Sequence, residues 1–148
     1  MTTKVSRLER LDPFVREHEC LHQSLDELRR LFEERQSPGK VAPALAQFAE
    51  HVQAHFIHEE EEEGFFDTVT DQAPRLKMRS DVLIEEHVAM ARELAKLQRH
   101  TTDGVVAADW WSRLSDEFES FWQSFCRHER AENELVLEAF DDDIGAEG

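Results

Sequence analysis

Breaks in the pattern of apolar residues divide the chain into four long segments. The breaks contain proline or glycine and lie at "QSPGK" (36–40), "DQAP" (71–74) and "TTDG" (101–104). Within the segments apolar residues return every three or four positions, and no stretch alternates with the period of two that indicates a strand. The sequence therefore predicts four helices, at about 12–35, 41–71, 75–100 and 109–140.

Four helices of this length with short connections are typical of an antiparallel up-down-up-down four-helix bundle, an all-α fold. A chain of 148 residues is long enough for one core, so residues 1–148 are interpreted as a single domain. Asp12 and Asp109 are suitable N-terminal caps for the first and fourth helices. Residues 1–11 are expected to form an arm, and the acidic residues 141–148 a loose tail.

The charge balance restricts the partners of this chain. Its net charge is −16, and the clustered Lys and Arg that bind phosphate are missing, so we expect no nucleic acid and no membrane partner. No apolar run reaches the roughly 18 residues of a membrane helix, and the N-terminus lacks the apolar segment of a signal peptide. The expected location is cytoplasmic. Cys20 and Cys126 are too few for a disulfide framework and are expected to be reduced thiols in the core.

The four segments form two related pairs. "EHECLHQSLDEL" (17–28) aligns with "EHVAMARELAKL" (86–97): both begin with Glu-His and place apolar residues at the same distances from the histidine. "HFIHEE" (55–60) aligns with "HERAEN" (128–133), since each has a glutamate four residues after its first histidine. The first and second helices thus correspond to the third and fourth.

The aligned histidines lean toward the predicted core. At roughly 100° per residue, His18 and His87 lie roughly 50° to one side of the apolar stripe of their helices. His55 and His128 lie roughly 60° to the other side, and the glutamate four residues after each is close to the centre of the stripe. Such an arrangement is required for an approximately two-fold site between four helices. The candidate metal ligands are His18, His55, Glu59, His87, His128 and Glu132.

These residue types indicate a metal rather than an ordinary core. A buried carboxylate costs several kcal/mol unless it is paired or bound to a cation, and no Lys or Arg occupies a matching inward position. Histidine and glutamate at i and i+4 are neighbours on one helix face and can meet the same ion. Four imidazoles and two bridging carboxylates suit two iron ions, each with two histidines, and leave positions open for a diatomic ligand; zinc or manganese fits the same donors.

The motifs resemble those of the hemerythrin-like (HHE cation-binding) proteins over about residues 12–140. "HFIHEE" is similar to the HFxxEE signature of the second helix in that family, the two Glu-His motifs to its first and third helices, and "HERAEN" to its fourth-helix HxxxE. The resemblance implies a bundle with an oxo- or hydroxo-bridged di-iron centre. The four histidines would be terminal ligands and the two glutamates would bridge. It also implies dioxygen binding or sensing, iron or nitric oxide handling, or a role in oxidative stress.

One departure concerns the number of histidines. Oxygen-carrying hemerythrins have another histidine one turn beyond the third-helix ligand, where this chain has Ala91. The departure argues against reversible oxygen carriage unless His22, His58 or Glu62 supplies a further ligand.

The second helix also offers an alternative register, because His58 and Glu62 are spaced as His55 and Glu59 are. We favour His55 and Glu59, since their offsets match those of the fourth helix and His58 lies roughly 80° from the centre of the stripe. The remaining glutamates of this run are interpreted as a solvated face: Glu60, Glu61 and Glu63.

Four more residues are assigned supporting roles. Glu17 and Glu86 precede the histidines of the first and third helices and lie near the edge of the stripe, so we expect them to contact ligands rather than to bind metal. Trp110 and Trp111 open the fourth helix, where they are expected to close one end of the bundle.

The functional hypothesis is a binding or sensing protein whose di-iron site takes dioxygen or nitric oxide in an apolar pocket lined by phenylalanines. The alternative is an enzyme that uses the same centre, as an oxidase, a peroxide scavenger or a protein that repairs iron centres. No general acid, substrate pocket or second domain is visible in the sequence, which favours binding over catalysis.

Overall fold

The computed structural model describes the backbone of residues 3–35, 37–102 and 107–147, and within this part of the chain it contains helices and no strand. The helices are α1 (Lys4–Glu9), α2 (Asp12–Glu34), α3 (Pro38–Glu60), α4 (Phe65–Gln72), the 3-10 helix η1 (Pro74–Leu76), α5 (Lys77–Thr102) and α6 (Trp110–Glu147). The all-α fold predicted from the sequence is confirmed.

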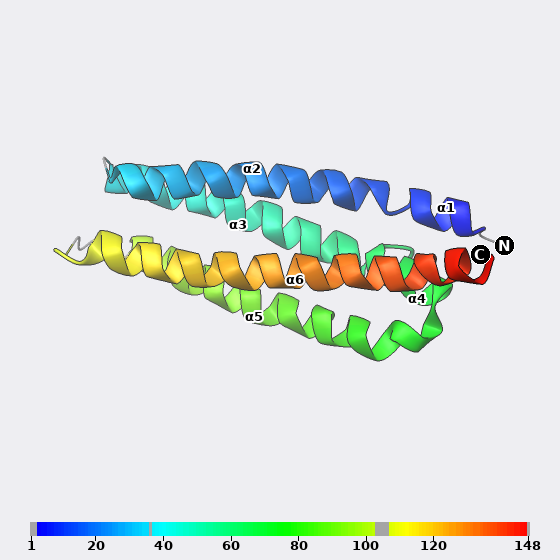
Figure 1. The fold of residues 1–148 in the computed structure, drawn as a ribbon. Helices are drawn as coiled ribbons and strands as arrows, with labels where there is room; N and C mark the ends of the chain where they lie inside the picture. The colour runs from blue at the N-terminus through cyan, green and yellow to red at the C-terminus, as the bar shows by residue number, and fades with distance from the viewer. Residues whose placement is uncertain (1–2, 36, 103–106, 148) are drawn as a thin grey trace.

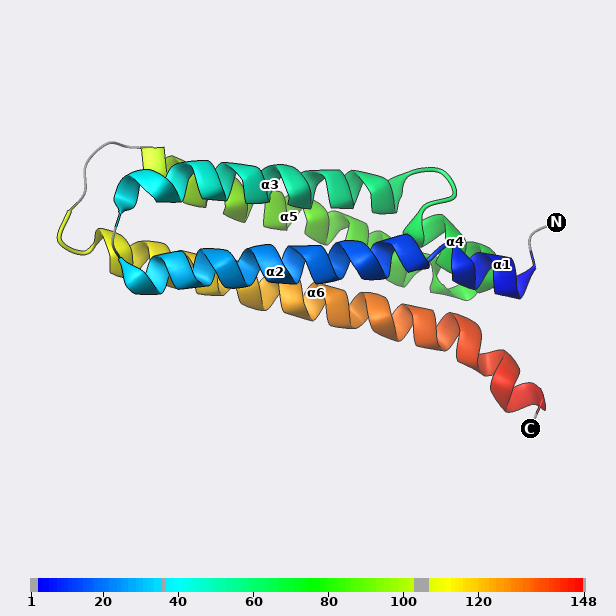
Figure 2. The ribbon, with the colours of Figure 1, turned by 90° about the horizontal axis from the view of Figure 1, so that it is seen from above.

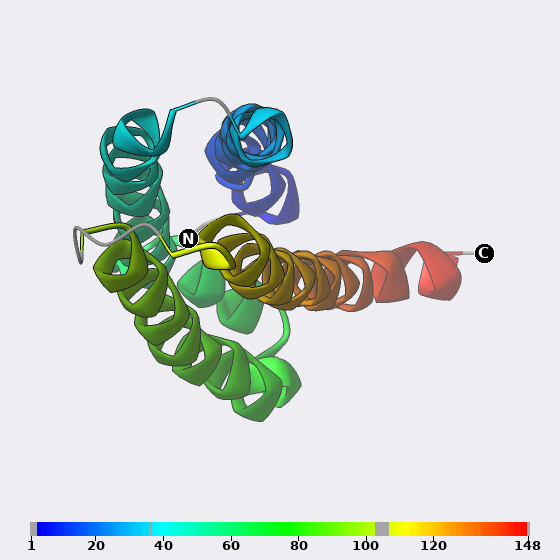
Figure 3. The same ribbon diagram turned by 90° about the vertical axis from the view of Figure 1, so that its left-hand side faces the viewer.

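Helices α2, α3, α5 and α6 form a bundle in which each runs opposite to the one before it (Figure 1). Seen from the end, they occupy the corners of a four-sided arrangement (Figure 3), and the contacting neighbours are α2 with α3, α3 with α5, α5 with α6 and α6 with α2. Helices α1 and α4 lie together at one end, and the C-terminal turns of α6 run away from the other helices (Figure 2).

Amphipathic helices bury their apolar stripes in two separate clusters. One cluster fills the end of the bundle near the α2–α3 connection and contains Phe48, Phe118 and Phe121. The other joins the start of α2 to α4 and the later part of α6, with Phe14, Phe65 and others. On α2, α5 and α6 the candidate ligands lie in sequence between the two clusters. On α3, Glu59 lies between them, whereas His55 precedes Phe56 of the first cluster.

The predicted continuous helix over 41–71 is wrong. Helix α3 ends at Glu60, and α4 begins at Phe65 after a turn in which Glu63 has a left-handed φ of 60°. Gly64 donates its N–H to the carbonyl of Glu61, and a Cβ at Gly64 would lie only 2.6 Å from the carbonyl oxygen of His58. The turn packs its backbone too closely for a side chain at this position, which explains the glycine.

The predicted arm and tail also differ from the structure. Residues 4–9 of the arm form α1, which is held to α4 by a hydrogen bond from Arg7 Nη1 to Gln72 Oε1. Most of the predicted tail continues α6 as far as Glu147. The predicted break at 101–104 lies partly outside the described residues, because residues 103–106 are not among them.

Two side-chain predictions outside the metal site have opposite outcomes. Cys20 is exposed, so its prediction as a core thiol is wrong, and Cys126 is only partly buried. Trp110 is buried in the end of the bundle and Trp111 packs against the same cluster, as predicted. Among the described residues, no helix is both long enough and apolar enough to cross a membrane.

Candidate metal centre

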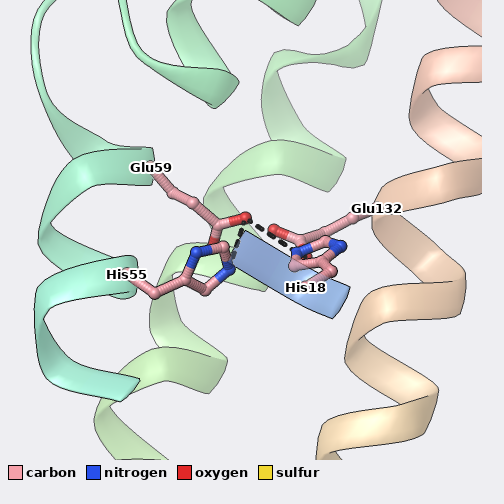
Figure 4. A group of neighbouring side chains, drawn as sticks. All are labelled: His18, His55, Glu59 and Glu132. Carbon is pink, nitrogen blue, oxygen red and sulfur yellow. Dashed lines mark ion pairs between the residues drawn. The ribbon is translucent and has the colours of Figure 1, made fainter. Parts of the chain in front are cut away.

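The six predicted ligands come together in the middle of the bundle. Each of the four long helices contributes one histidine, and α3 and α6 add one glutamate each. The side chain of His18 is 14% exposed, whereas the other five residues are at most 4% exposed. Figure 4 shows His55 and Glu59 projecting from α3 toward His18 and Glu132. Helical spacing alone places each donor on the inner face, and the bundle brings the faces together.

The donor atoms form two groups that share the carboxylates. The first group is His18, His55, Glu59 and Glu132, and the second is Glu59, His87, His128 and Glu132; within each, one donor atom per residue lies within 4.8 Å of the others. Each group therefore combines two imidazoles with the same two carboxylates.

Each carboxylate offers one oxygen to each pair of histidines. Oε2 of Glu59 lies 3.3 Å from His55 Nε2, and Oε1 lies 3.1 Å from His87 Nε2. Likewise, Oε1 of Glu132 lies 3.4 Å from His18 Nε2, and Oε2 lies 3.5 Å from His128 Nε2. This is the orientation a carboxylate needs to bridge two cations.

The described residues of the protein leave several of these donor atoms without hydrogen bonds, although Nε2 of His87 and Nε2 of His128 lie 3.0 Å from each other. Both carboxylate oxygens of Glu59, both of Glu132 and Nε2 of His18 are buried and have no hydrogen-bond partner. Such atoms cost free energy unless something satisfies them, and cations held by the two groups of donors would satisfy them. The residues thus fit a cation site chemically as well as geometrically.

In three of the histidines, the ring nitrogen that faces away from the cluster, Nδ1, contacts a carboxylate of a neighbouring helix. Nδ1 of His55 lies 2.7 Å from Glu17 Oε1, and Nδ1 of His128 lies 2.9 Å from Glu86 Oε1. Because an ionised carboxylate only accepts hydrogen bonds, these contacts place the proton on Nδ1 and leave Nε2 as the inward donor atom. The sequence had indicated this role for both glutamates.

The third such contact was missed. Nδ1 of His87 lies 2.8 Å from Oε2 of Glu60, a residue predicted from its sequence position to belong to the solvated face. Glu60 directly follows Glu59, just as Glu17 and Glu86 directly precede inward-facing histidines. Its position next to an inward-facing residue was therefore the signal that could have identified it.

The alternative ligands lie outside the cluster. Glu62 is exposed and follows the end of α3, so the second i, i+4 pair does not continue along one helix face. Nδ1 of His58 lies 2.6 Å from the other oxygen of Glu17, and Nε2 of His22 lies 2.8 Å from Glu129 Oε2. The structure brings neither histidine into the two groups of donors.

Protons occupy the cluster when no cation is present. Burial alone would lower the pKa of His18, but the adjacent Glu132 and Glu59 carboxylates raise it to about 10. Burial is likewise outweighed at His128, where Glu132 and Glu86 raise the pKa to about 9. Burial and the facing Glu59 carboxylate raise the pKa of Glu132. A cation that binds here at neutral pH must displace protons.

Aromatic rings enclose the cluster. The ring of Phe56 stacks on His87 with centroids 3.9 Å apart and an interplanar angle of 8°. Phe66 contacts the same imidazole, while Phe14 packs edge-on against His55. These contacts fix the orientation of the imidazoles and keep bulk water away from the donor atoms.

A groove between α2 and α3 leads from the surface to one side of the cluster. Its volume is about 660 Å³, and its walls include Glu17, His51, His55 and His58. The walls include neither His87 nor His128. Of the six candidate ligands, only His55 lines this groove.

Comparison with known protein families places this chain in one of them. The model of the hemerythrin HHE cation binding domain matches residues 10–140. The chain belongs to this family of cation-binding proteins. No curated protein and no solved structure gives a significant match to the chain.

Proposed function

We propose that the centre holds two iron ions and that the protein binds or senses dioxygen or nitric oxide there. His18 and His55 would hold one ion and His87 and His128 the other. Glu59 and Glu132 would bridge them. The observation that supports this proposal above all is the division of each carboxylate between the two histidine pairs, with one oxygen on either side.

The donor set is compatible with iron. Imidazole and carboxylate donors suit iron, zinc and manganese, and no cysteine belongs to either group of donors. Two imidazoles and one oxygen of each glutamate would hold each ion, and these donors would leave coordination positions open to a further ligand. Two iron ions, when bound, supply redox-active centres that take a diatomic ligand at these positions.

The chain contributes orientation and exclusion of water. Carboxylates behind His55, His87 and His128 fix the imidazoles, and phenylalanine rings limit the room around the donors. A diatomic molecule can approach through the groove between α2 and α3. These features suit a small ligand better than a large organic substrate.

An enzyme that consumes oxygen or peroxide is the second candidate. One observation favours it: Glu17 contacts Nδ1 of both His55 and His58, and the side chain of His58 is 40% exposed in the groove. Hydrogen bonds thus connect the inner cluster to the surface, and such a connection could carry protons for catalysis.

The two candidates give different optical behaviour. The protein would be purified, its iron counted per chain, reduced without oxygen and then exposed to oxygen while the visible spectrum is recorded. A charge-transfer band that appears with oxygen and disappears under vacuum supports binding. Irreversible oxidation with repeated consumption of peroxide supports the enzyme, and less than about half an equivalent of any transition metal after reconstitution rules out both.

A further inference from the structure

The repeat relates the carboxylates that support the ligands in one half of the centre to residues of the other half. The repeat aligns Glu17 with Glu86, and the contacts of these residues to His55 and His128 are equivalent. It also aligns Glu60 of "HFIHEE" with Asn133 of "HERAEN". Of the three carboxylates that contact Nδ1 of a ligand histidine, only Glu60 aligns with a residue that is not a carboxylate. The halves also differ where His58 aligns with Ala131.

Because Asn133 replaces a glutamate, Nδ1 of His18 has no carboxylate partner in the described part of the chain. Glu60 contacts Nδ1 of His87, so symmetry would place Asn133 behind Nδ1 of His18. Asn133 is exposed, and among the described residues none forms a hydrogen bond with Nδ1 of His18. An asparagine side chain is shorter than that of a glutamate and carries no charge.

Neighbouring groups do not replace the missing carboxylate. Glu129 lies on the same helix as Asn133 and its charge contributes to the raised pKa of His18, but its Oε2 is bonded to His22. His18 is also the most exposed of the four histidines, with a side chain that is 14% accessible. It is therefore the ligand with the least support from the protein.

The groove opens on the same half of the centre. Its walls include His55, which shares a donor group with His18, and they exclude the histidines of the second group. His18 itself does not line the groove. The missing carboxylate at Nδ1 of His18 and the groove at His55 are two independent observations, and both concern the first donor group.

We infer that the protein holds its two cations unequally: the cation between His18 and His55 is the exchangeable one, and Asn133 is the residue that makes it so. This inference rests on the proposed di-metal centre. Partners behind a metal-binding histidine change metal affinity by about 10- to 100-fold, so the difference between the sites should be of this order. Asn133 acts through His18 and is a positioning residue.

Release of the cations to a chelator tests the inference. Protein loaded with two equivalents of iron or zinc is mixed with an excess of a coloured chelator, and the released metal is followed with time. Two phases of one equivalent each are expected, with rates that differ about 10-fold or more. A protein that binds fewer than about half an equivalent contradicts the proposed centre, whereas two equivalents released in one phase contradict only the inference.

Two reciprocal variants assign the phases. Asn133→Glu should slow the fast phase about 10-fold and leave the slow phase unchanged, while the matched variant Asn133→Gln, of equal length but neutral, should have a smaller effect. Glu60→Asn should accelerate only the slow phase, because it gives His87 the neighbour that His18 has. Circular dichroism verifies that each variant is folded. An unchanged fast phase in Asn133→Glu, or a faster fast phase in Glu60→Asn, overturns the assignment.

Discussion

Nδ1 of His87 on α5 lies 2.8 Å from Oε2 of Glu60 on α3. The partly exposed side chain of Glu60 thus orients a histidine that is only 4% exposed. Similar contacts join α2 to α3 and α5 to α6. The acidic surface of this protein is therefore partly an extension of its metal centre, and exposed glutamates can alter metal binding when they are replaced.

The choice between the two registers on α3 can be tested by alanine substitution. His55→Ala removes an inward donor and should abolish loading of the cation that it shares with His18. His58→Ala removes contacts to Glu17 and to the ring of Phe14 but no inward donor, and it should weaken loading by less than about 10-fold. Metal per chain is measured by elemental analysis after reconstitution and gel filtration. Full loading of His55→Ala together with loss in His58→Ala would show that the other register binds.

The Glu86 carboxylate, which contacts Nδ1 of a ligand histidine, should contribute more to metal affinity than the exposed carboxylate of Glu85. Glu86→Gln weakens the contact to Nδ1 of His128 and should lower metal affinity about 10- to 100-fold. Glu85→Gln removes the same charge from an exposed position next to it and should leave affinity unchanged. Competition with a chelator of known affinity measures both. Equal losses in the two variants would indicate a general effect of surface charge instead.

Gly64 should be intolerant of any side chain. A Cβ there would lie 2.6 Å from the carbonyl oxygen of His58, so Gly64→Ala should destabilise the fold by about 1–3 kcal/mol. Gly39→Ala is the matched control, because a Cβ at that helical position meets nothing within 4 Å. It should be neutral or stabilising by up to about 1 kcal/mol. Denaturant unfolding checks both, and equal stability of the two variants would contradict the close packing of this turn.

The stability of the cation-free protein should fall as the pH rises from neutral to alkaline. The pKa values of His18 and His128 are raised from 6.5 to about 10 and about 9, so their protonated forms stabilise the folded state fully below pH 6.5. This stabilisation is lost as the pH rises through 9 and 10. Thermal unfolding between these limits measures the effect. A flat profile would contradict the raised pKa values.

Cation binding should release protons for the same reason. Two of the imidazoles are protonated at neutral pH in the cation-free protein, and a metal takes only the neutral form. Calorimetric titration with zinc in buffers of different ionisation enthalpy counts the protons. His128→Ala should lower the count, whereas replacement of the exposed His51 by alanine should not. Binding with no proton release would show that the cluster starts out unprotonated.

The inner faces of the helices could be predicted because helical geometry is local. A period of 3.6 residues relates each histidine to the apolar stripe of its own segment, and the repeat made the offsets comparable between segments. The six donors follow from this pattern alone. The turn before α4 could not be predicted in this way, because the helical pattern of apolar residues continues through it and only Gly64 marks the break.

Sequence alone determined that four amphipathic helices carry two histidine pairs and two inward carboxylates, since each of these features is decided within one segment. Only the tertiary structure decided which groups stand behind the ligands. Glu60 and His87 are 27 residues apart and belong to different helices, so their contact depends on how α3 and α5 pack. The same packing leaves Nδ1 of His18 without a carboxylate partner among the described residues and places His55 in the wall of the groove. Contacts between helices, unlike helical periodicity, are settled only when the bundle assembles.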